Sequence, residues 1–207
     1  MPDPLVVFGS GGHAKVVIEA ALAREPSREI VILDDSPDAS GRSILGIAVT
    51  GGREVLQSLG GSPVMPAIGD NRGRISLIDW LREQGYALAT VVHPSALIGA
   101  SVVLGAGVFV SAGAIVIAQA RIGDGAIVNT GASVDHDCVV GQAAHIGPGV
   151  HLCGNVHVGA RTLVGVGSCA RPGISICDDV VIAAGSVVVA DINEAGTYAG
   201  NPARRLR

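Results

Sequence analysis

Residues 122–146 are IGDGAI VNTGAS VDHDCV VGQAAH I, and an aliphatic residue stands at every sixth position of this stretch. The same spacing extends without a gap over residues 98–193, as sixteen consecutive hexads whose first residue is always aliphatic. Glycine often follows that residue, and the fifth position is uncharged and mostly small. A period of six fits neither a helix nor an isolated strand. It is typical of a parallel β-helix, in which short strands alternate with turns.

The composition agrees with such a fold and excludes several others. The chain has 207 residues, of which 48% are hydrophobic and only five are aromatic, so small aliphatic side chains must fill its core. This apolar fraction excludes a disordered chain, and 30 glycines without a G-X-Y period exclude collagen. A net charge of −4 with a single lysine argues against duplex nucleic acid as a partner.

No membrane span or signal peptide is expected. Every window of 18 residues is interrupted by polar residues or glycine, and no charged segment followed by a long apolar run begins the chain. The four cysteines form no C-x-x-C pair. We therefore expect a soluble, cytoplasmic protein with reduced thiols and no membrane contact.

The chain before the repeat alternates apolar runs with helical patterns, which predicts an α/β region with a parallel sheet. Strands are expected at 5–8, 30–33, 63–68 and 87–92, and helices at 14–24, 53–59 and from Asp70 or Asn71 through Gln84, with Ile75, Ile78 and Leu81 on its buried face. The predicted organisation is an α/β domain at 1–92, a β-helix at 93–193 and a tail at 194–207. The first of these is small and Rossmann-like.

A glycine-rich segment, Gly9-Ser10-Gly11-Gly12-His13-Ala14, joins the first strand to the first helix and matches G-x-G-x-x-[GA]. Glycines let the backbone approach a phosphate, and a helix N-terminus favours negative charge. Asp34 and Asp35 end the next strand, about where a ribose-binding acid would lie. The 97 residues before the repeat are too few for a six-stranded dinucleotide domain, so a nucleoside diphosphate sugar fits better. The motif alone leaves a tight turn without a ligand as the alternative.

The hexads resemble those of the left-handed β-helix acyltransferases, and YAGNPAR at 198–204 resembles the G-x-P-A-[KR] ending of that superfamily. The resemblance implies a left-handed coil with three walls and 18 residues per turn. First-position side chains then point inward and third-position side chains lie at the surface.

Four segments narrow the resemblance to one subgroup: VFGSGGHAK at 7–15, LDD at 33–35, IGDN at 68–71 and NTGASVDHDC at 129–138. They resemble the nucleotide-sugar N-acetyltransferases of bacillosamine and perosamine synthesis and their sialic acid O-acetyltransferase-like relatives. The similarity extends over essentially the whole chain. It implies a homotrimer with active sites between subunits and a role in glycan biosynthesis.

The resemblance also implies roles for individual residues. His136 matches the catalytic base and Asp137 its helper, although relatives have Glu there and Asp135 could compete for that role. Acetyl-CoA would be bound by Asn129, His145, Gly154, Val166 and Ala184. The nucleotide sugar would be bound by Gly9, Ser10, Gly11, Gly12, His13, Asp34, Asp35 and Gly69.

The reaction expected from this resemblance is direct acetyl transfer to the amine of a UDP- or GDP-linked 4-amino-4,6-dideoxy sugar. No residue distinguishes uracil from guanine. O-acetylation of a sialic acid or another sugar hydroxyl is an alternative, and a non-catalytic nucleotide-binding scaffold is another.

The histidines do not predict a metal site. His145, His151 and His157 share one hexad phase, so they should lie on three different walls, and only residues 18 apart stack directly. A metal-dependent carbonic anhydrase of the repeat class is therefore less expected. Cys138 occupies an inward fifth position, which predicts a core residue and not a nucleophile.

Overall fold

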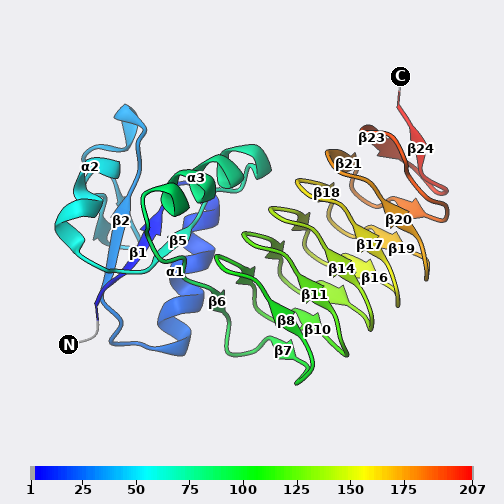
Figure 1. Cartoon of the computed structure of the whole chain (residues 1–207), viewed down its shortest axis with the longest axis horizontal. Helices are drawn as coiled ribbons and strands as arrows, with labels where there is room; N and C mark the ends of the chain where they lie inside the picture. Colours follow the sequence, from blue (N-terminus) through cyan, green and yellow to red (C-terminus); the bar gives the residue numbers. More distant parts are fainter. Residues whose placement is uncertain (1–2, 207) are drawn as a thin grey trace.

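The computed structural model describes residues 3–206. In it, an α/β region is followed along the chain by a parallel β-helix. The α/β region lies beside the first coils of a parallel β-helix, whose coils then extend away from it to the C-terminus (Figure 1). No helix within residues 3–206 has the length and apolarity needed to cross a membrane.

The α/β region is built on a three-stranded parallel sheet in the order β2-β1-β5. Its elements, in chain order, are β1 (Leu5–Phe8), α1 (Gly12–Arg24), β2 (Ile30–Leu33), a 3-10 turn (Pro37–Ala39), the hairpin β3 (Ser43–Ile44) and β4 (Ile47–Ala48), α2 (Arg53–Leu56) with a 3-10 turn (Gln57–Leu59), β5 (Val64–Pro66) and α3 (Asn71–Glu83). The expected parallel sheet is therefore present.

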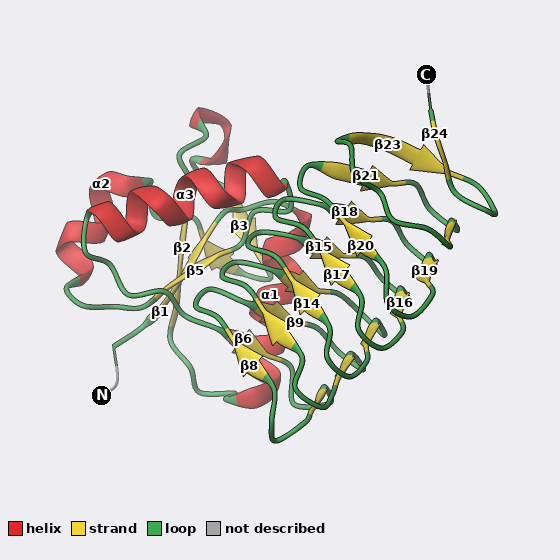
Figure 2. Ribbon diagram, turned by 45° about the vertical axis from the view of Figure 1, so that its right-hand side comes forward, coloured by secondary structure: helices red, strands yellow, loops and turns green. Residues whose placement is uncertain are grey.

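Alternate strand residues pack on the two faces of this sheet. Leu5 and Val7 face α1, whereas Val6 and Phe8 face α2 and α3. The helix α1 is consequently sandwiched between the sheet and the β-helix (Figure 2). This sandwich buries apolar side chains on both sides of the helix, which explains its weak amphipathic pattern.

The β-helix has three walls, each a parallel ladder with a register of 18 residues. The first wall consists of β6 (Val91–Val92), β9 (Phe109–Val110), β12 (Ile127–Val128), β15 (His145–Ile146), β18 (Leu163–Val164), β21 (Val180–Ile182) and β23 (Gly196–Ala199), with β24 (Arg204–Arg205) antiparallel at its end. The second consists of β7 (Leu97–Ile98), β10 (Ile115–Val116), β13 (Ser133–Val134), β16 (His151–Leu152), β19 (Cys169–Ala170) and β22 (Val187–Val188). The third consists of β8 (Val103–Leu104), β11 (Arg121–Ile122), β14 (Val139–Val140), β17 (His157–Val158) and β20 (Ser175–Ile176).

The hexad positions take the places that the sequence predicts. First-position residues such as Val134 and Ile146 are fully buried, and fifth-position residues such as Ala132 and Cys138 line the same core. From Gly107 to Gly185 the fourth position turns the corner with a positive φ, for which glycine is common and Asp137 (φ 59°) is one of the exceptions.

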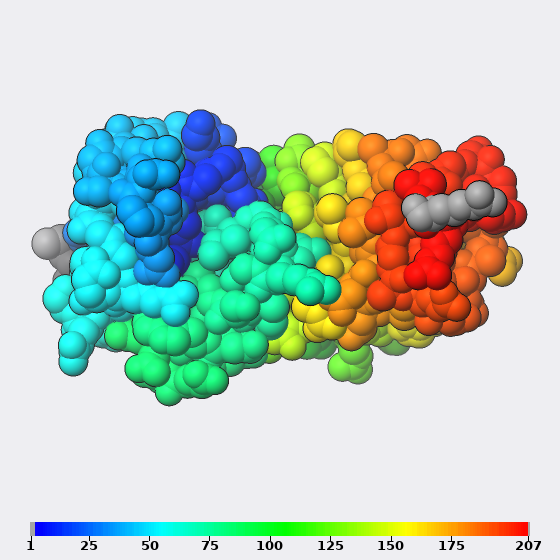
Figure 3. Space-filling view, turned by 90° about the horizontal axis from the view of Figure 1, so that it is seen from above, coloured from blue at the N-terminus to red at the C-terminus, as the bar shows by residue number. Residues whose placement is uncertain are grey.

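The α/β region packs on the first wall and on the turns that lead into it. Phe109 and Ile127 point outward from this wall and are buried against α1. Part of the strand expected at 87–92, β6, belongs to this wall, because it pairs with β9. Seen from above, the α/β region and the coils form one continuous elongated body (Figure 3).

Candidate active site

The glycine-rich segment forms a pocket of about 370 Å³ at the carboxyl end of β1. It is lined by Phe8, Gly9, Ser10, Gly11, Gly12, His13, Asp34, Asp35, Ala67, Ile68 and Gly69. A Cβ on Gly9, whose φ is +118°, would lie 2.7 Å from the carbonyl oxygen of Ala67, so only glycine fits there. The helix α1 starts at this pocket and has no side-chain cap, which leaves its first N–H groups available to an anion.

Asp34 and Asp35 both lie in this pocket, but their carboxylates already have partners. Asp34 accepts hydrogen bonds from the backbone and hydroxyl of Ser10, at 2.7 and 2.6 Å, and from the backbone of Ser36. Burial acts to raise the pKa of Asp34, but these hydrogen bonds outweigh it and hold the pKa below its usual value. Asp35 pairs with Arg53. In this structure the two acids therefore fix the loops around the pocket.

His13 is held neutral beside the pocket. Its ring packs edge-on against Phe109 of the β-helix, and its Nε2 is buried without a hydrogen-bond partner among the described residues. Burial, followed by the charge of Arg74 and the proximity of His145, lowers its pKa to about 3. A neutral ring can donate one N–H.

His145 lies on β15 of the first wall, close to the same pocket. The Nδ2 of Asn129 is 3.0 Å from its Nε2, and the Oδ1 of Asn129 accepts from the backbone of Thr130. Burial lowers the pKa of His145 to about 4, followed by the charge of Arg74, whereas a backbone hydrogen bond to Gly69 acts in the opposite direction. With Asn129 as donor, Nε2 is an acceptor, so a neutral His145 carries its proton on Nδ1.

His136 lies on the turn between β13 and β14 and is exposed over 57% of its side chain. Its Nδ1 is 2.8 Å from Oδ2 of Asp137, while Asp135 accepts from the backbone N–H of His136. The hydrogen bond to Asp137 raises the pKa of His136 against a small opposing effect of burial, and the charges of Asp135 and Asp137 add to it. Asp137, and not Asp135, thus contacts the ring and leaves Nε2 free.

Gly154 supports this ring from the next coil. A Cβ at position 154 would lie 2.3 Å from Cε1 and Nε2 of His136. The imidazole therefore lies directly over the Gly154 backbone. In addition, the backbone N–H of Asn155 donates to the carbonyl of His136 at 2.8 Å.

The predicted site residues fall on two different edges of the prism. His136 and Gly154 lie on turns between the second and third walls. Asn129, Val166 and Ala184 lie on turns between the first and second walls, and His145 is on the first wall itself. One chain therefore brings together the glycine-rich pocket, His13, His145 and Asn129, but it does not bring His136 to them.

The three histidines that share one position of the hexad lie on different walls, as expected. His145, His151 and His157 are on the first, second and third walls, respectively. Among the residues that the structure describes, no group of three histidine, cysteine or acidic side chains could hold a metal ion.

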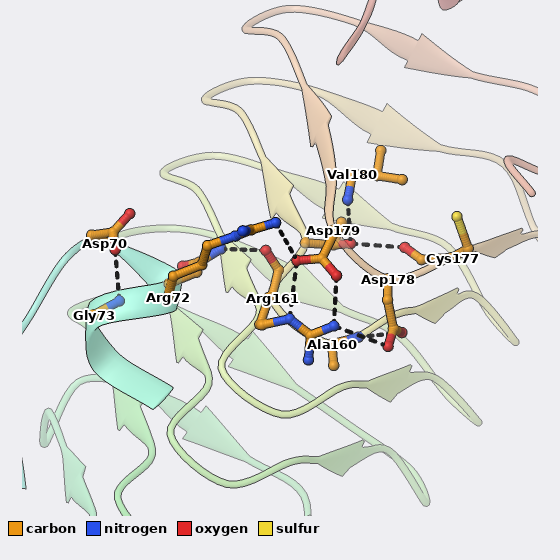
Figure 4. A network of polar contacts seen from close by, with 11 residues as sticks. Asp70, Arg72, Gly73, Ala160, Arg161, Cys177, Asp178, Asp179 and Val180 are labelled. Atoms are coloured by element: carbon orange, nitrogen blue, oxygen red, sulfur yellow. Dashed lines mark hydrogen bonds and ion pairs between the residues drawn. The ribbon is translucent and has the colours of Figure 1, made fainter. Parts of the chain in front are cut away.

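A polar network joins α3 to the turns that lead into the first wall (Figure 4). Arg161 pairs with Asp179 at 2.6 Å and with Asp178 at 3.4 Å, and Arg72 reaches Asp179 from α3 at 3.2 Å. A second pocket of about 240 Å³ lies between these side chains and Gly69. Gly69 is thus a wall that the two pockets share.

The sequence analysis missed Arg74, which is fully buried between α3 and the β-helix. It donates to Gly125, Ala143 and Ala144 of the coils and to Ile68, Gly69 and Asn71 of the α/β region. An arginine on a helix with a polar outer face gives no signal that it is buried.

Two family models match parts of this chain. A family model described as the PglD N-terminal domain matches residues 4–81, and one described as a hexapeptide repeat of succinyl-transferase matches residues 156–190. Among solved structures, a His-to-Asn variant of perosamine N-acetyltransferase from Caulobacter crescentus, in complex with CoA and GDP-perosamine, is 42% identical. The match covers 100% of this chain and 98% of that one, with a TM-score of 0.93.

Two further structures are similar over nearly the whole chain. The acetyltransferase domain of PglB from Neisseria gonorrhoeae, in complex with acetyl coenzyme A, is 40% identical, with 99% of both chains covered and a TM-score of 0.93. WeeI from Acinetobacter baumannii is 24% identical, with 98% and 99% covered and a TM-score of 0.88, and it shares the fold.

A small α/β region followed by a left-handed β-helix, together with these similarities, defines a hexapeptide-repeat acyltransferase, which confirms the predicted fold and enzyme class. Within that class, the chain belongs to the family of the bacillosamine and perosamine N-acetyltransferases.

Proposed function

We propose that this enzyme transfers the acetyl group of acetyl-CoA to the amine of a UDP- or GDP-linked 4-amino-4,6-dideoxy sugar. The observation that carries the proposal is the full-length similarity, at 42% identity, to a structure that holds both CoA and GDP-perosamine. The geometry of this chain supports the following roles for its residues.

The pocket at the start of α1 is suited to the diphosphate. It offers backbone N–H groups at an uncapped helix N-terminus and close backbone approach at Gly9. His13 adds one neutral ring beside them. The ribose and base then extend toward Asp34 and Asp35, where a polar pocket of about 310 Å³ continues the first.

His136 is the proposed general base. The amine must be neutral to attack the thioester, so its proton has to be removed, and Nε2 of His136 is the nitrogen that Asp137 leaves free. The C–N bond forms, the C–S bond breaks, and the CoA thiolate leaves and then takes up a proton. The tetrahedral oxyanion needs hydrogen-bond donors, for which a backbone N–H of the coil is better suited than Nε2 of His145, because Asn129 already occupies that nitrogen as donor.

The active site is proposed to form between two copies of the chain in a homotrimer. The nucleotide pocket and His145 lie on the side of the first wall, whereas His136 lies on the edge between the other two walls. The five residues proposed to bind acetyl-CoA are divided between two edges in the same way. A neighbouring copy that places its His136 and Gly154 against Asn129 and Val166 would complete one site.

Exposed aliphatic side chains on the walls support such an assembly. Leu97 and Val103 are exposed over about half of their surface, and Ile115 and Val139 continue the same two ladders. Contact between copies would remove these side chains from water. Light scattering should find a trimer, and a monomer at micromolar concentration contradicts this part of the proposal.

The release of CoA thiol from acetyl-CoA tests the reaction. The acceptors are UDP- and GDP-linked 4-amino-dideoxy sugars, UDP-glucosamine and free sialic acid. Fast release with one amino sugar supports the proposal and identifies the nucleotide. Release only with a hydroxyl acceptor indicates O-acetylation, and CoA that neither binds nor reacts indicates a scaffold.

A further inference from the structure

Arg74 is the largest fully buried side chain of the protein, and the proposed chemistry gives it no task. It stands one turn into α3, where the helix faces the β-helix. All five of its N–H groups have acceptors: Nε donates to Gly125, Nη1 to Ile68 and Gly69, and Nη2 to Asn71 and Ala143. Buried charge is costly unless it is fully hydrogen-bonded, and here it is.

These acceptors belong to two different parts of the molecule. Ile68 and Gly69 form the wall of the nucleotide pocket. Gly125 and Ala143 are on turns of two successive coils, and Ala143 lies two residues before His145. One guanidinium therefore fixes the pocket wall to the coil that carries His145.

The bonding pattern requires an arginine. Five N–H groups in a planar fork reach carbonyls in several directions, whereas a lysine ammonium has three donors on a flexible stem. Neither Asp70 nor any other carboxylate within residues 3–206 forms an ion pair with Arg74. The positive charge is thus turned toward carbonyl groups and the two neighbouring imidazoles of His13 and His145.

We propose that Arg74 is a positioning residue of the acetyl transfer, which holds the proposed nucleotide pocket in register with His145 and Asn129. The inference rests on the proposed function, because it assigns the sugar to the pocket and the thioester to the coil. A displacement of about 1 Å between reacting groups is enough to reduce a rate a hundredfold.

The neutral state of the two histidines follows from the same geometry. Burial is the largest cause that lowers the pKa of both histidines. Arg74 and His145 add to it at His13, whereas at His145 Arg74 adds to it and the Gly69 backbone opposes it. The pKa of Arg74 itself is lowered by burial to about 10, partly offset by the charge of Asp70, so it stays charged at neutral pH. A neutral His145 can keep the Asn129 hydrogen bond on Nε2.

The experiment compares Arg74→Lys and Arg74→Met with Arg82→Met as the matched control. Arg82 is also on α3 and also pairs with the β-helix, through Asp124, but it is partly exposed and does not contact the pocket. Each variant is checked for folding and assembly, and kcat, KM for the sugar nucleotide, and the Kd of UDP and GDP are measured. The titration of His13 and His145 is followed by NMR, with signals assigned from His13→Gln and His145→Gln.

We expect Arg74→Lys to lower kcat on the order of tenfold to a hundredfold. The Kd of UDP or GDP should change less than about threefold. This Kd reports the binding of the diphosphate, which in the proposal contacts α1 and β1. Both histidines stay neutral at pH 6 in this variant, whereas in Arg74→Met their pKa values rise. Arg82→Met should leave kcat and both titrations unchanged.

Three results would overturn the inference: a folded Arg74→Met variant with normal kcat, a loss of nucleotide affinity as large as the loss of kcat, or an equal effect of Arg82→Met. If Arg74→Met does not fold, Arg74→Lys decides alone, and normal turnover of that variant contradicts the proposal. Absence of acetyl transfer in the wild type contradicts the proposed function, and the imidazole titrations then still test the effect of Arg74 on His13 and His145.

Discussion

Only one nitrogen of His136 is available to a substrate, because Nδ1 faces Asp137 at 2.8 Å. The exchange of His136 for Ala keeps the turn and removes this base, so we expect kcat to fall about a hundredfold or more. Nucleotide affinity should be unchanged, because the pocket lies in the α/β region. Thiol release and nucleotide titration measure the two effects separately. Near-normal turnover would exclude His136 from the mechanism.

In the proposed mechanism, Asp137 sets the pH at which His136 is free to act as the base. The general base must be neutral, and the carboxylate of Asp137 raises the pKa of His136, so kcat/KM should rise with pH through a value above 6.5. Asp137→Asn tolerates the positive φ at this position, and it should move the acid limb of the profile to lower pH. Asp135→Asn is the control, with a smaller shift, because Asp135 contacts only the backbone of His136. An unmoved limb in Asp137→Asn contradicts this role.

At the level of single elements, Gly154 on the turn after β16 determines where His136, on the turn after β13, can place its ring. A methyl group at position 154 would overlap the His136 ring, so Gly154→Ala should turn the imidazole away from its place. We expect kcat to fall roughly tenfold to a hundredfold, with little loss of stability, since the ring is exposed. Kinetics and thermal unfolding of the same sample measure both. Unchanged kcat shows that the ring finds its place without glycine.

The elements also differ in how far sequence predicts them. Each coil repeats the same inward and outward positions, so the hexads from Ile98 onward predict the walls and the burial of Val134 or Cys138 directly. On α3 the same reasoning is less successful. Ile78 and Leu81 are buried as expected, but Ile75 is only half-buried while Arg74 is fully buried. The partners of Arg74 lie 51 and 69 residues away, and only the packed structure brings them together.

The candidate site, too, is predicted from sequence only in part. The glycine-rich segment predicts its pocket because the strand, the turn and the helix are adjacent in sequence. The hydrogen bonds that occupy Asp34 depend on Ser10 from the turn after β1, and the pattern of acids gives no sign of them. Asp135 and Asp137 are equivalent by spacing, and it is the positive φ of Asp137 that turns its carboxylate to the ring.

For the molecule as a whole, the junction between the α/β region and the β-helix should make stability sensitive to acid. His13 and His145 are buried there as neutral rings, with pKa values of about 3 and about 4 against 6.5 in an unfolded chain. Below pH 6.5 these two histidines bind protons in the unfolded state but stay unprotonated in the folded state. Stability is therefore fully present above pH 6.5 and decreases as the pH falls toward 4.

Between pH 6.5 and 5, each buried histidine should lower the free energy of unfolding by on the order of 2 kcal/mol. His136 acts with the opposite sign, because its pKa is raised, but its exposure makes the effect small. Thermal unfolding at one protein concentration measures the dependence, since assembly would otherwise shift Tm. The control is His157→Gln, which removes an exposed histidine and should leave the pH slope unchanged, whereas His145→Gln should reduce it. An equal slope in both variants would mean that the acid sensitivity does not arise at this junction.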